Sequence, residues 1–530
     1  MGASPVDQIT EAFLAVRAAL KPAHLQVRTM SARTIMIQGT GSNVGKSVIT
    51  AAFCSYFRQK GFRVAPFKSQ NMSNNSFVTA SGGEIGRAQA FQAQMCGIEP
   101  TVEMNPILLK PTSEIGAQVV VLGKAVRVMS PREYHEFQPQ LIGVIRESLE
   151  KLCSQCDILV IEGAGSPAEI NLRQFDIVNM AVAEMAAAPV VLVGDIDLGG
   201  VFASLVGTLE LLTPKERSFV KGLLINKFRG DISLLNGGLE FLETRTGKKL
   251  LGVLPFVADL QVAEEDSIPE WKRRSSHPAE LEKLTIHVIH HPHISNSTDF
   301  ESLEREPDVC VRFLKRVPDS EALPDALILP GSKSTMSDLA YMRSAGFQNY
   351  VDRCRRARIP IVGICGGHQM LGRELVDPEG VESAVETAVG LGLLDLATRF
   401  EREKKTVQVR AVDIEGRHEI IGYEIHMGRT NGPDAARPVF EIVEEMGSNT
   451  ERFDGAKSED GLVWGTYIHG VFDAPLFRRE FLNALRKRRG WKPLDSSDAC
   501  CFAKSSDSLA ALIRDHVDLV ALDHILDRTL

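Results

Sequence analysis

Short apolar runs rich in β-branched residues recur along the chain, and stretches with helical spacing separate them. In the first part of the chain these runs lie at residues 34–39, 157–161, 189–195 and 222–226. Continuous apolar runs bounded by turn residues are typical of buried strands, and strands that alternate with helices form parallel sheets. Residues 33–260 are therefore predicted to be one α/β domain with a doubly wound parallel sheet.

A second alternation of the same kind begins at Leu284, with apolar runs at residues 284–289, 326–329 and 359–364. It predicts a second α/β domain over residues 284–530. After Phe472 we expect helices, with an amphipathic C-terminal tail that packs on the second domain.

The segments outside these two domains have different patterns. Residues 1–32 are predicted to be a leader with a short amphipathic helix. Residues 261–283 are charged, contain two prolines, and read as a linker.

A glycine-rich turn follows the first predicted strand and opens a helix. It comprises Gly39, Thr40, Gly45, Lys46 and Ser47 in the order Gly-Thr-Gly-Ser-Asn-Val-Gly-Lys-Ser. Backbone N–H groups at such a turn bind phosphate, the lysine neutralises the β- and γ-phosphates of ATP, and the serine hydroxyl ligates Mg²⁺. The alternative is a chance glycine turn with a surface lysine.

Polar residues follow the other strands of this domain at the edge where a ligand would bind. Glu162 ends the apolar run 157–161, where a carboxylate is expected to ligate Mg²⁺. Lys68 and Asn71 follow the second strand, and Glu84 and Arg87 open the next helix. Taken alone, these last four residues indicate only a polar turn and a polar helix start.

A sharp turn with glycines follows the strand at residues 359–364. Cys365 precedes Gly366 and Gly367 there, which is the pattern of a nucleophile elbow with cysteine in place of serine. The N–H of Gly366 can stabilise an oxyanion, and the helix N-terminus that follows favours the thiolate. His469 ends a late strand, where the general base of such a site is expected; the alternative is a buried structural histidine.

Composition excludes several other classes of protein. The formal net charge is −8 with both signs interspersed, which argues against nucleic-acid binding. The nine cysteines form no paired metal-binding framework, and no apolar run approaches the length of a membrane span. We expect a reduced, cytoplasmic enzyme with small-molecule substrates and no membrane partner; its oligomeric state stays open.

The two predicted sites explain each other. A Cys–His site on an elbow can release ammonia from glutamine, and an ATP site can activate a substrate carboxylate as an acyl phosphate. Ammonia then displaces phosphate to form an amide. This predicts a glutamine-hydrolysing, ATP-dependent amidoligase.

From about Thr34 onward the chain resembles the cobyric acid synthase family. The resemblance implies a P-loop domain like dethiobiotin synthetase, joined to a flavodoxin-like class I (triad-type) glutamine amidotransferase domain. It also implies use of ATP and Mg²⁺ to amidate the b, d, e and g carboxylates of adenosylcobyrinic acid a,c-diamide. The motifs that carry it, beside the phosphate loop and the Cys365 and His469 segments, lie at 71–76, 83–89, 162–172, 195–203, 225–231, 293–300, 329–334 and 423–430.

The resemblance also assigns roles by position. Asn226 would contact adenine, Lys68 would face the activated carboxylate, and Gly331 and Gly366 would be the oxyanion donors. The corrinoid is expected to contact residues from a set that comprises Lys68, Asn71, Glu84, Arg87, Arg173 and Arg229. Surface ion pairs are the alternative role for the three arginines.

The chain departs from the expected patterns at a few positions. Val471 stands where many class I amidotransferases have a glutamate two residues after the histidine, which leaves a Cys–His dyad. Leu198 and Ser81 replace an expected arginine and aspartate. Alternatives left open are amidation of another polycarboxylate, as by cobyrinic acid a,c-diamide synthase, a nucleotide-switched regulatory ATPase with a cysteine hydrolase domain, and a homologue that only binds.

Overall fold

The computed structural model describes most of the chain. The described residues are 32–112, 116–257, 283–318, 322–383, 385–495 and 502–527. The predicted leader helix and nearly all of the predicted linker lie outside these residues.

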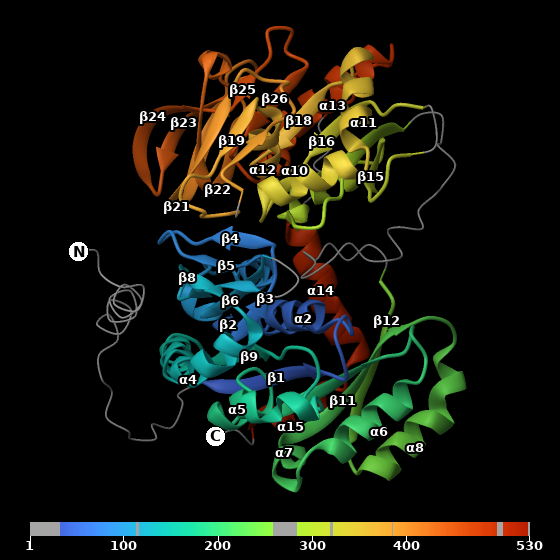
Figure 1. The fold of residues 1–530 in the computed structure, drawn as a ribbon. Coiled ribbons are helices and arrows are strands. Elements are labelled where there is room, and N and C mark those ends of the chain that lie inside the picture. The colour runs from blue at the N-terminus through green and yellow to red at the C-terminus, as the bar shows by residue number, and fades with distance from the viewer. Residues whose placement is uncertain are drawn as a thin grey trace, which may run out of the picture.

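A six-stranded parallel sheet forms the centre of the first domain, as predicted (Figure 1). Its strands in spatial order are β12 (Lys249–Pro255), β11 (Val220–Phe228), β10 (Val190–Asp195), β1 (Arg33–Gly39), β9 (Ile158–Glu162) and β2 (Val64–Phe67). The central strand β1 is buried on both faces, with Ile35 and Ile37 in one core cluster and Met36 in the other. The phosphate loop therefore leaves the middle of the sheet, between the loops that follow β9 and β10.

Helices cover both faces of this sheet. They are α2 (Lys46–Gln59), α3 (Arg87–Cys96), α4 (Pro131–Cys153), α5 (Met180–Met185), α6 (Val201–Leu211), α7 (Pro214–Phe219) and α8 (Asn236–Thr246). A small sheet of β3 (Gln70–Met72), β6 (Ile107–Pro111), β7 (Ala117–Val121) and β8 (Lys124–Met129) lies beside them, with a hairpin of β4 (Ser76–Val78) and β5 (Glu84–Gly86).

The second domain has its own six-stranded sheet, which is parallel except at one edge. The order is β15 (Val309–Leu314), β13 (Leu284–Ile289), β16 (Ala326–Leu329), β18 (Ile361–Ile364), β26 (Val463–Thr466) and β25 (Ala456–Lys457). Its helices are α9 (Glu301–Glu304), α10 (Thr335–Ser344), α11 (Phe347–Arg356), α12 (Gly366–Leu371) and α13 (Pro475–Arg488). This arrangement confirms the predicted α/β class.

A further sheet of the second domain, antiparallel except where β19 pairs with β21, was not predicted. It comprises β19 (Glu374–Val376), β20 (Thr387–Val389), β21 (Ala397–Asp413), β22 (Glu419–Asn431), β23 (Phe440–Glu445) and β24 (Ser448–Asp454). In Figure 1 the ends of β21 and β22 lie over the β4–β5 hairpin of the first domain. Phe77 and Val78 of the hairpin pack there against Tyr423 and Ile425.

The prediction that the C-terminal tail packs on the second domain is wrong. Helices α14 (Phe502–His516) and α15 (Leu519–Asp527) complete the core of the first domain, and Figure 1 shows α14 beside α2. Ser55 of α2 donates a hydrogen bond to the carbonyl oxygen of Ser506 at 2.8 Å. An amphipathic helix specifies that one face is buried but does not specify against which domain, which explains the error.

We expect Ile513→Ala to destabilise the first domain by about 2–5 kcal/mol, because Ile513 is 0% exposed in its core. Hydrogen exchange of residues 46–59 should accelerate while the second domain keeps its protection. Val520→Ala, at a position that is 69% exposed, is the control that should change neither. Faster exchange confined to the second domain would contradict this packing.

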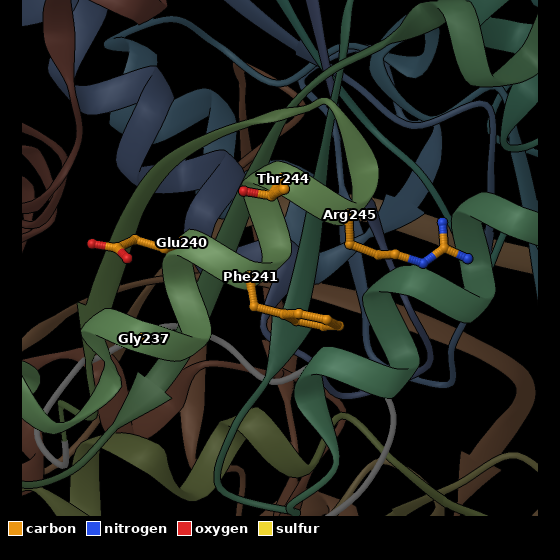
Figure 2. Close-up of a pocket in the computed structure, with 5 residues that line it drawn as sticks. All are labelled: Gly237, Glu240, Phe241, Thr244 and Arg245. Atoms are coloured by element: carbon orange, nitrogen blue, oxygen red, sulfur yellow. The ribbon is translucent and has the colours of Figure 1, made fainter.

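Two surface observations complete the description. Figure 2 shows a hollow along α8, lined by Gly237, Glu240, Phe241, Thr244 and Arg245; none of these is a predicted site residue. Over the described part of the chain, no helix is both long and apolar enough to cross a bilayer.

Candidate active sites

The phosphate loop has the geometry that its glycines predict. Gly45 begins α2 with φ of +98°, and a side chain there would place its Cβ 2.3 Å from Nδ2 of Asn226. Asn226 itself donates a hydrogen bond to the carbonyl oxygen of Val44 at 2.8 Å. Gly39 ends β1, and the N–H of Thr40 donates to the carbonyl oxygen of Val193 in β10 at 2.9 Å. The structure thus brings the loop and Asn226 together, and the contact of Asn226 with adenine stays a prediction.

A hydroxyl group and an ammonium group of this site meet at one carboxylate. Ser47 donates to Oε1 of Glu162 at 2.8 Å, and Lys68 donates to the same oxygen at 2.9 Å. Lys46 reaches across to the carbonyl oxygen of Gly165 at 3.1 Å. Glu162 is 1% exposed and Lys68 is 3% exposed. Because a buried charge without a partner is costly, the carboxylate and the ammonium group stabilise each other.

An amide side chain also contacts this carboxylate, and further buried amides belong to the same domain. Gln92 of α3 donates to Oε2 of Glu162, and Asn71 donates to Gln89 at 2.9 Å. Oε1 of Gln92 and Oε1 of Gln38 are buried and have no hydrogen-bond partner among the residues that the structure describes. A hydroxyl, a carboxylate and unpartnered amide oxygens are the donors that Mg²⁺ prefers, so the residues present fit this ion.

Cys365 has the strained backbone of a nucleophile elbow. It lies between β18 and α12 with φ of +51°, a conformation that L side chains rarely adopt. A Cβ at Gly367 would lie 2.0 Å from the carbonyl oxygen of Leu329, so glycine is required for the turn to pack. The thiol is 6% exposed and lies 3.4 Å from the carbonyl oxygen of Ile425.

His469 has a carboxylate partner that the sequence did not reveal. Oδ2 of Asp299 lies 2.7 Å from Nδ1 of His469, and its other oxygen accepts the N–H of Gly470 at 3.0 Å. The amide nitrogen of Asn296 also lies 3.1 Å from Nε2 of the ring. Burial lowers the pKa of His469, but Asp299 and Cys365 outweigh it and raise that pKa to about 10. The site is therefore a Cys–His–Asp triad rather than the predicted dyad.

One of the two predicted oxyanion donors, Gly366, directly follows the nucleophile, and the other, Gly331, lies beside His469. A Cβ at Gly366 would lie 2.8 Å from the backbone nitrogen of Ser332, and one at Gly331 would lie 3.2 Å from Cε1 of His469. Ser332 is held by Asp338, which accepts its hydroxyl at 2.6 Å. Their role as oxyanion donors stays a prediction, supported by this placement.

We expect Asp299→Asn to lower glutamine hydrolysis by about 10²-fold, because asparagine cannot stabilise the imidazolium form of His469. The loss of activity should be smaller than in a triad whose histidine is positioned by the aspartate alone, because Asn296 also contacts the ring of His469. Glutamate release measures it, and amidation driven by added ammonia should not change. Asp352→Asn, on the surface helix α11, is the control.

Two residues predicted to bind the substrate also make contacts between the domains. Glu84 is 1% exposed, and its carboxylate accepts hydrogen bonds from Lys110 and from Lys404 of β21. Arg87 stacks on Phe77 and lies 3.5 Å from a carboxylate oxygen of Asp473. Each oxygen of Glu84 thus accepts a hydrogen bond from a lysine, and substrate contacts of Glu84 and Arg87 stay predictions.

The other arginines are engaged near the surface of the first domain. Arg173 donates to the carbonyl oxygen of Leu211, and Arg229 donates to Asp197 at 3.1 Å. Leu198, at the position of an expected arginine, follows β10 and is 80% exposed. The surface ion pairs that the sequence analysis gave as the alternative role are therefore present. A contact of these arginines with the corrinoid stays a prediction.

A phosphate loop beside a buried carboxylate, joined to a Cys–His–Asp site on an elbow, defines the class of glutamine-dependent, ATP-using ligases. Family models agree with this class. The model described as "CobQ/CobB/MinD/ParA nucleotide binding domain" matches residues 35–269, and the model described as "CobB/CobQ-like glutamine amidotransferase domain" matches residues 285–477.

Curated relatives cover nearly the whole chain. A cobyric acid synthase from Pelotomaculum thermopropionicum is 50% identical over 92% of this chain and 95% of its own length. Those from Sorangium cellulosum and Klebsiella pneumoniae are 49% and 47% identical over 94% and 93% of this chain, and over 100% and 97% of their own lengths. The chain belongs to the cobyric acid synthase family.

Proposed function

We propose that this chain uses ATP and glutamine to amidate the b, d, e and g carboxylates of adenosylcobyrinic acid a,c-diamide in the cytoplasm. The observation that carries the proposal is the presence of two complete sites in one member of this family. Cys365, His469 and Asp299 form one site. Lys46, Ser47 and Glu162 form the other.

At the first site the thiolate of Cys365 attacks the side-chain amide of glutamine. Backbone N–H groups near Gly331 and Gly366 stabilise the oxyanion that forms. The imidazolium of His469 donates a proton to the departing ammonia, and water then hydrolyses the thioester to glutamate.

At the second site the residues hold ATP and a substrate carboxylate in line. Ser47 and Glu162 would hold Mg²⁺, which neutralises charge on the transferring phosphoryl group when it is bound. Lys46 neutralises the β- and γ-phosphates of ATP. Lys68 donates a hydrogen bond to Glu162. From this position it can orient the carboxylate of the substrate, which becomes the acyl phosphate. Ammonia attacks this activated carbon because a free carboxylate is a poor electrophile.

The test is to incubate the purified chain with adenosylcobyrinic acid a,c-diamide, ATP, Mg²⁺ and glutamine, and to follow the corrinoid by mass spectrometry. Stepwise replacement of carboxyl by amide groups, up to four, is the expected result. An unchanged corrinoid with ATP still consumed would contradict the proposal and favour another acceptor.

A further inference from the structure

Asp338 is a buried carboxylate of the second domain that the reaction scheme above does not use. It lies on α10 and is 0% exposed, although a lone carboxylate is among the groups that are most costly to bury. Such a group is stable in a domain core only where several donors hold its charge. The donors around Asp338 therefore show which part of the domain depends on that charge.

The donors to Asp338 come from both strands of one short ribbon. The ribbon consists of β14 (Ile294–Ser295) and β17 (Gly331–Ser332), which pair antiparallel. The hydroxyl of Ser332 donates to Oδ2 of Asp338 at 2.6 Å. His293, directly before β14, donates its backbone N–H to Oδ1 at 3.2 Å, and its Nδ1 lies 2.8 Å from the same oxygen. One carboxylate thus ties both strands of the ribbon to α10.

The same ribbon contacts the elbow and the catalytic histidine. A Cβ at Gly331 would lie 3.2 Å from Cε1 of His469, and the backbone nitrogen of Ser332 packs against Gly366 of the elbow. The chain continues from β14 into Asn296, whose amide nitrogen lies 3.1 Å from Nε2 of His469. A shift of the ribbon would therefore change the packing around the nucleophile and its histidine, and with it the position of a predicted oxyanion donor.

The contacts of Asp338 stabilise its charged form. Burial raises the pKa of Asp338, but its contacts with His291, His293 and Ser332 outweigh burial and lower that pKa. Nδ1 of His291 lies 2.7 Å from Oδ2, and the hydrogen bond to Asp338 raises the pKa of His293. An ionised carboxylate accepts hydrogen bonds at both oxygens, whereas an asparagine amide accepts at its oxygen and donates at its nitrogen. Asp338→Asn would therefore keep the shape of the side chain and lose part of its hold on the ribbon.

We propose that Asp338 is a positioning residue for glutamine hydrolysis, which fixes the ribbon of β14 and β17 against the elbow in the arrangement that stabilises the oxyanion. Asp338 acts on the reaction through the ribbon and does not touch glutamine. The proposal rests on the proposed hydrolysis of glutamine at Cys365, and it adds a residue outside the triad on which the rate of that step depends.

The first test is glutamine hydrolysis by the full-length chain and by its Asp338→Asn variant. The kcat should fall by about 10–100-fold, because a displaced oxyanion donor stabilises the transition state less well. The KM should stay within about threefold, because the oxyanion forms only after glutamine has bound. Asp352→Asn, on α11 of the same domain, is the matched control and should change neither value.

Alkylation of Cys365 separates positioning from a general loss of structure. Iodoacetamide reacts with the thiolate by displacement of iodide and forms no oxyanion, so its rate at Cys365 should be unchanged in Asp338→Asn. Mass spectrometry of the peptide that contains Cys365 measures this rate apart from the other cysteines. A change in the alkylation rate as large as the change in kcat, or an unchanged kcat, would overturn the proposal.

Ser332 supplies a milder pair of variants, which keeps the test decisive if Asp338→Asn does not fold. Ser332→Ala removes one donor to the carboxylate and should lower kcat by about 3–10-fold, whereas Ser332→Thr keeps the hydroxyl and should retain the wild-type kcat. Ser344→Ala, at an exposed position at the end of α10, is the control for the lost hydroxyl. A wild-type kcat in Ser332→Ala would count against the role of the ribbon and overturn the proposal.

The outcome is separable from that of the proposed function. Hydrolysis and alkylation are read without a corrinoid, whereas the proposed function is read from amidation of the corrinoid. The expected pattern in a chain that leaves the corrinoid unchanged would support the role of Asp338 while the proposed function fails. A wild-type chain that hydrolyses no glutamine overturns both.

Discussion

Replacing Cys365 with alanine is expected to lower glutamine-driven amidation by at least about 10⁴-fold, because no other group can form the thioester. Amidation driven by ammonium chloride at alkaline pH should stay within about twofold of the wild type, since ammonia then reaches the second site without the thiol. Formation of amide groups on the corrinoid, followed by mass spectrometry with each nitrogen source, measures both effects.

The matched control is Cys310→Ala. Cys310 lies half-buried on β15 of the same domain and has a free thiol, but it is not on the elbow. The Cys310→Ala substitution should leave the rate of amidation unchanged with glutamine and with ammonia. An equal loss with glutamine and with ammonia in Cys365→Ala would contradict the division of labour between the two sites.

Replacing Glu162 with glutamine should not discriminate between nitrogen sources and should lower amidation by about 10³-fold with either one. Ser47 and Lys68 both donate to Oε1 of this carboxylate. Glutamine keeps the shape but removes the negative charge that would hold Mg²⁺ and balance buried Lys68. Steady-state kinetics of phosphate release and of amide formation measure the loss, and hydrolysis of glutamine without ATP should persist.

Glu169→Gln is the control for that prediction, because Glu169 lies exposed on the loop that follows the same strand β9. Thermal unfolding of both variants is needed as well. A Glu162→Gln chain that amidates with added ammonia at the wild-type rate would show that the carboxylate does not serve phosphoryl transfer.

The parts of the sites that lie on continuous segments could be predicted from the sequence. The phosphate loop, Glu162 and the elbow at Cys365 each follow a buried strand, and a parallel sheet brings the carboxyl ends of its strands to one edge. Asp299 was missed because it lies 170 residues before His469 on a separate short helix, where only a Thr-Asp-Phe motif marks it. A hydrogen bond between such distant segments produces no spacing pattern in the sequence, so it could not be predicted.

Glu84 shows a second limit of the sequence. The sequence predicts that Glu84 opens a polar helix, but the structure places it in β5, just before α3. A polar residue there fits a substrate ligand as well as a buried ion pair. The ion pair could not be predicted because Lys404, which makes part of it, comes from the other domain. Similarly, the long strands β21 and β22 carry many charged residues because one face is open to solvent, so their apolar alternation is weak.

The tail that joins α2 has a consequence for how the chain is made. Residues 505–526 fill the core next to Ile35 and Ile37, yet a ribosome produces them only after the entire second domain. The first domain leaves the ribosome early with an apolar face exposed, and that face is covered only after the tail has been made. We infer that the second domain reaches its native packing first, although its sequence comes later.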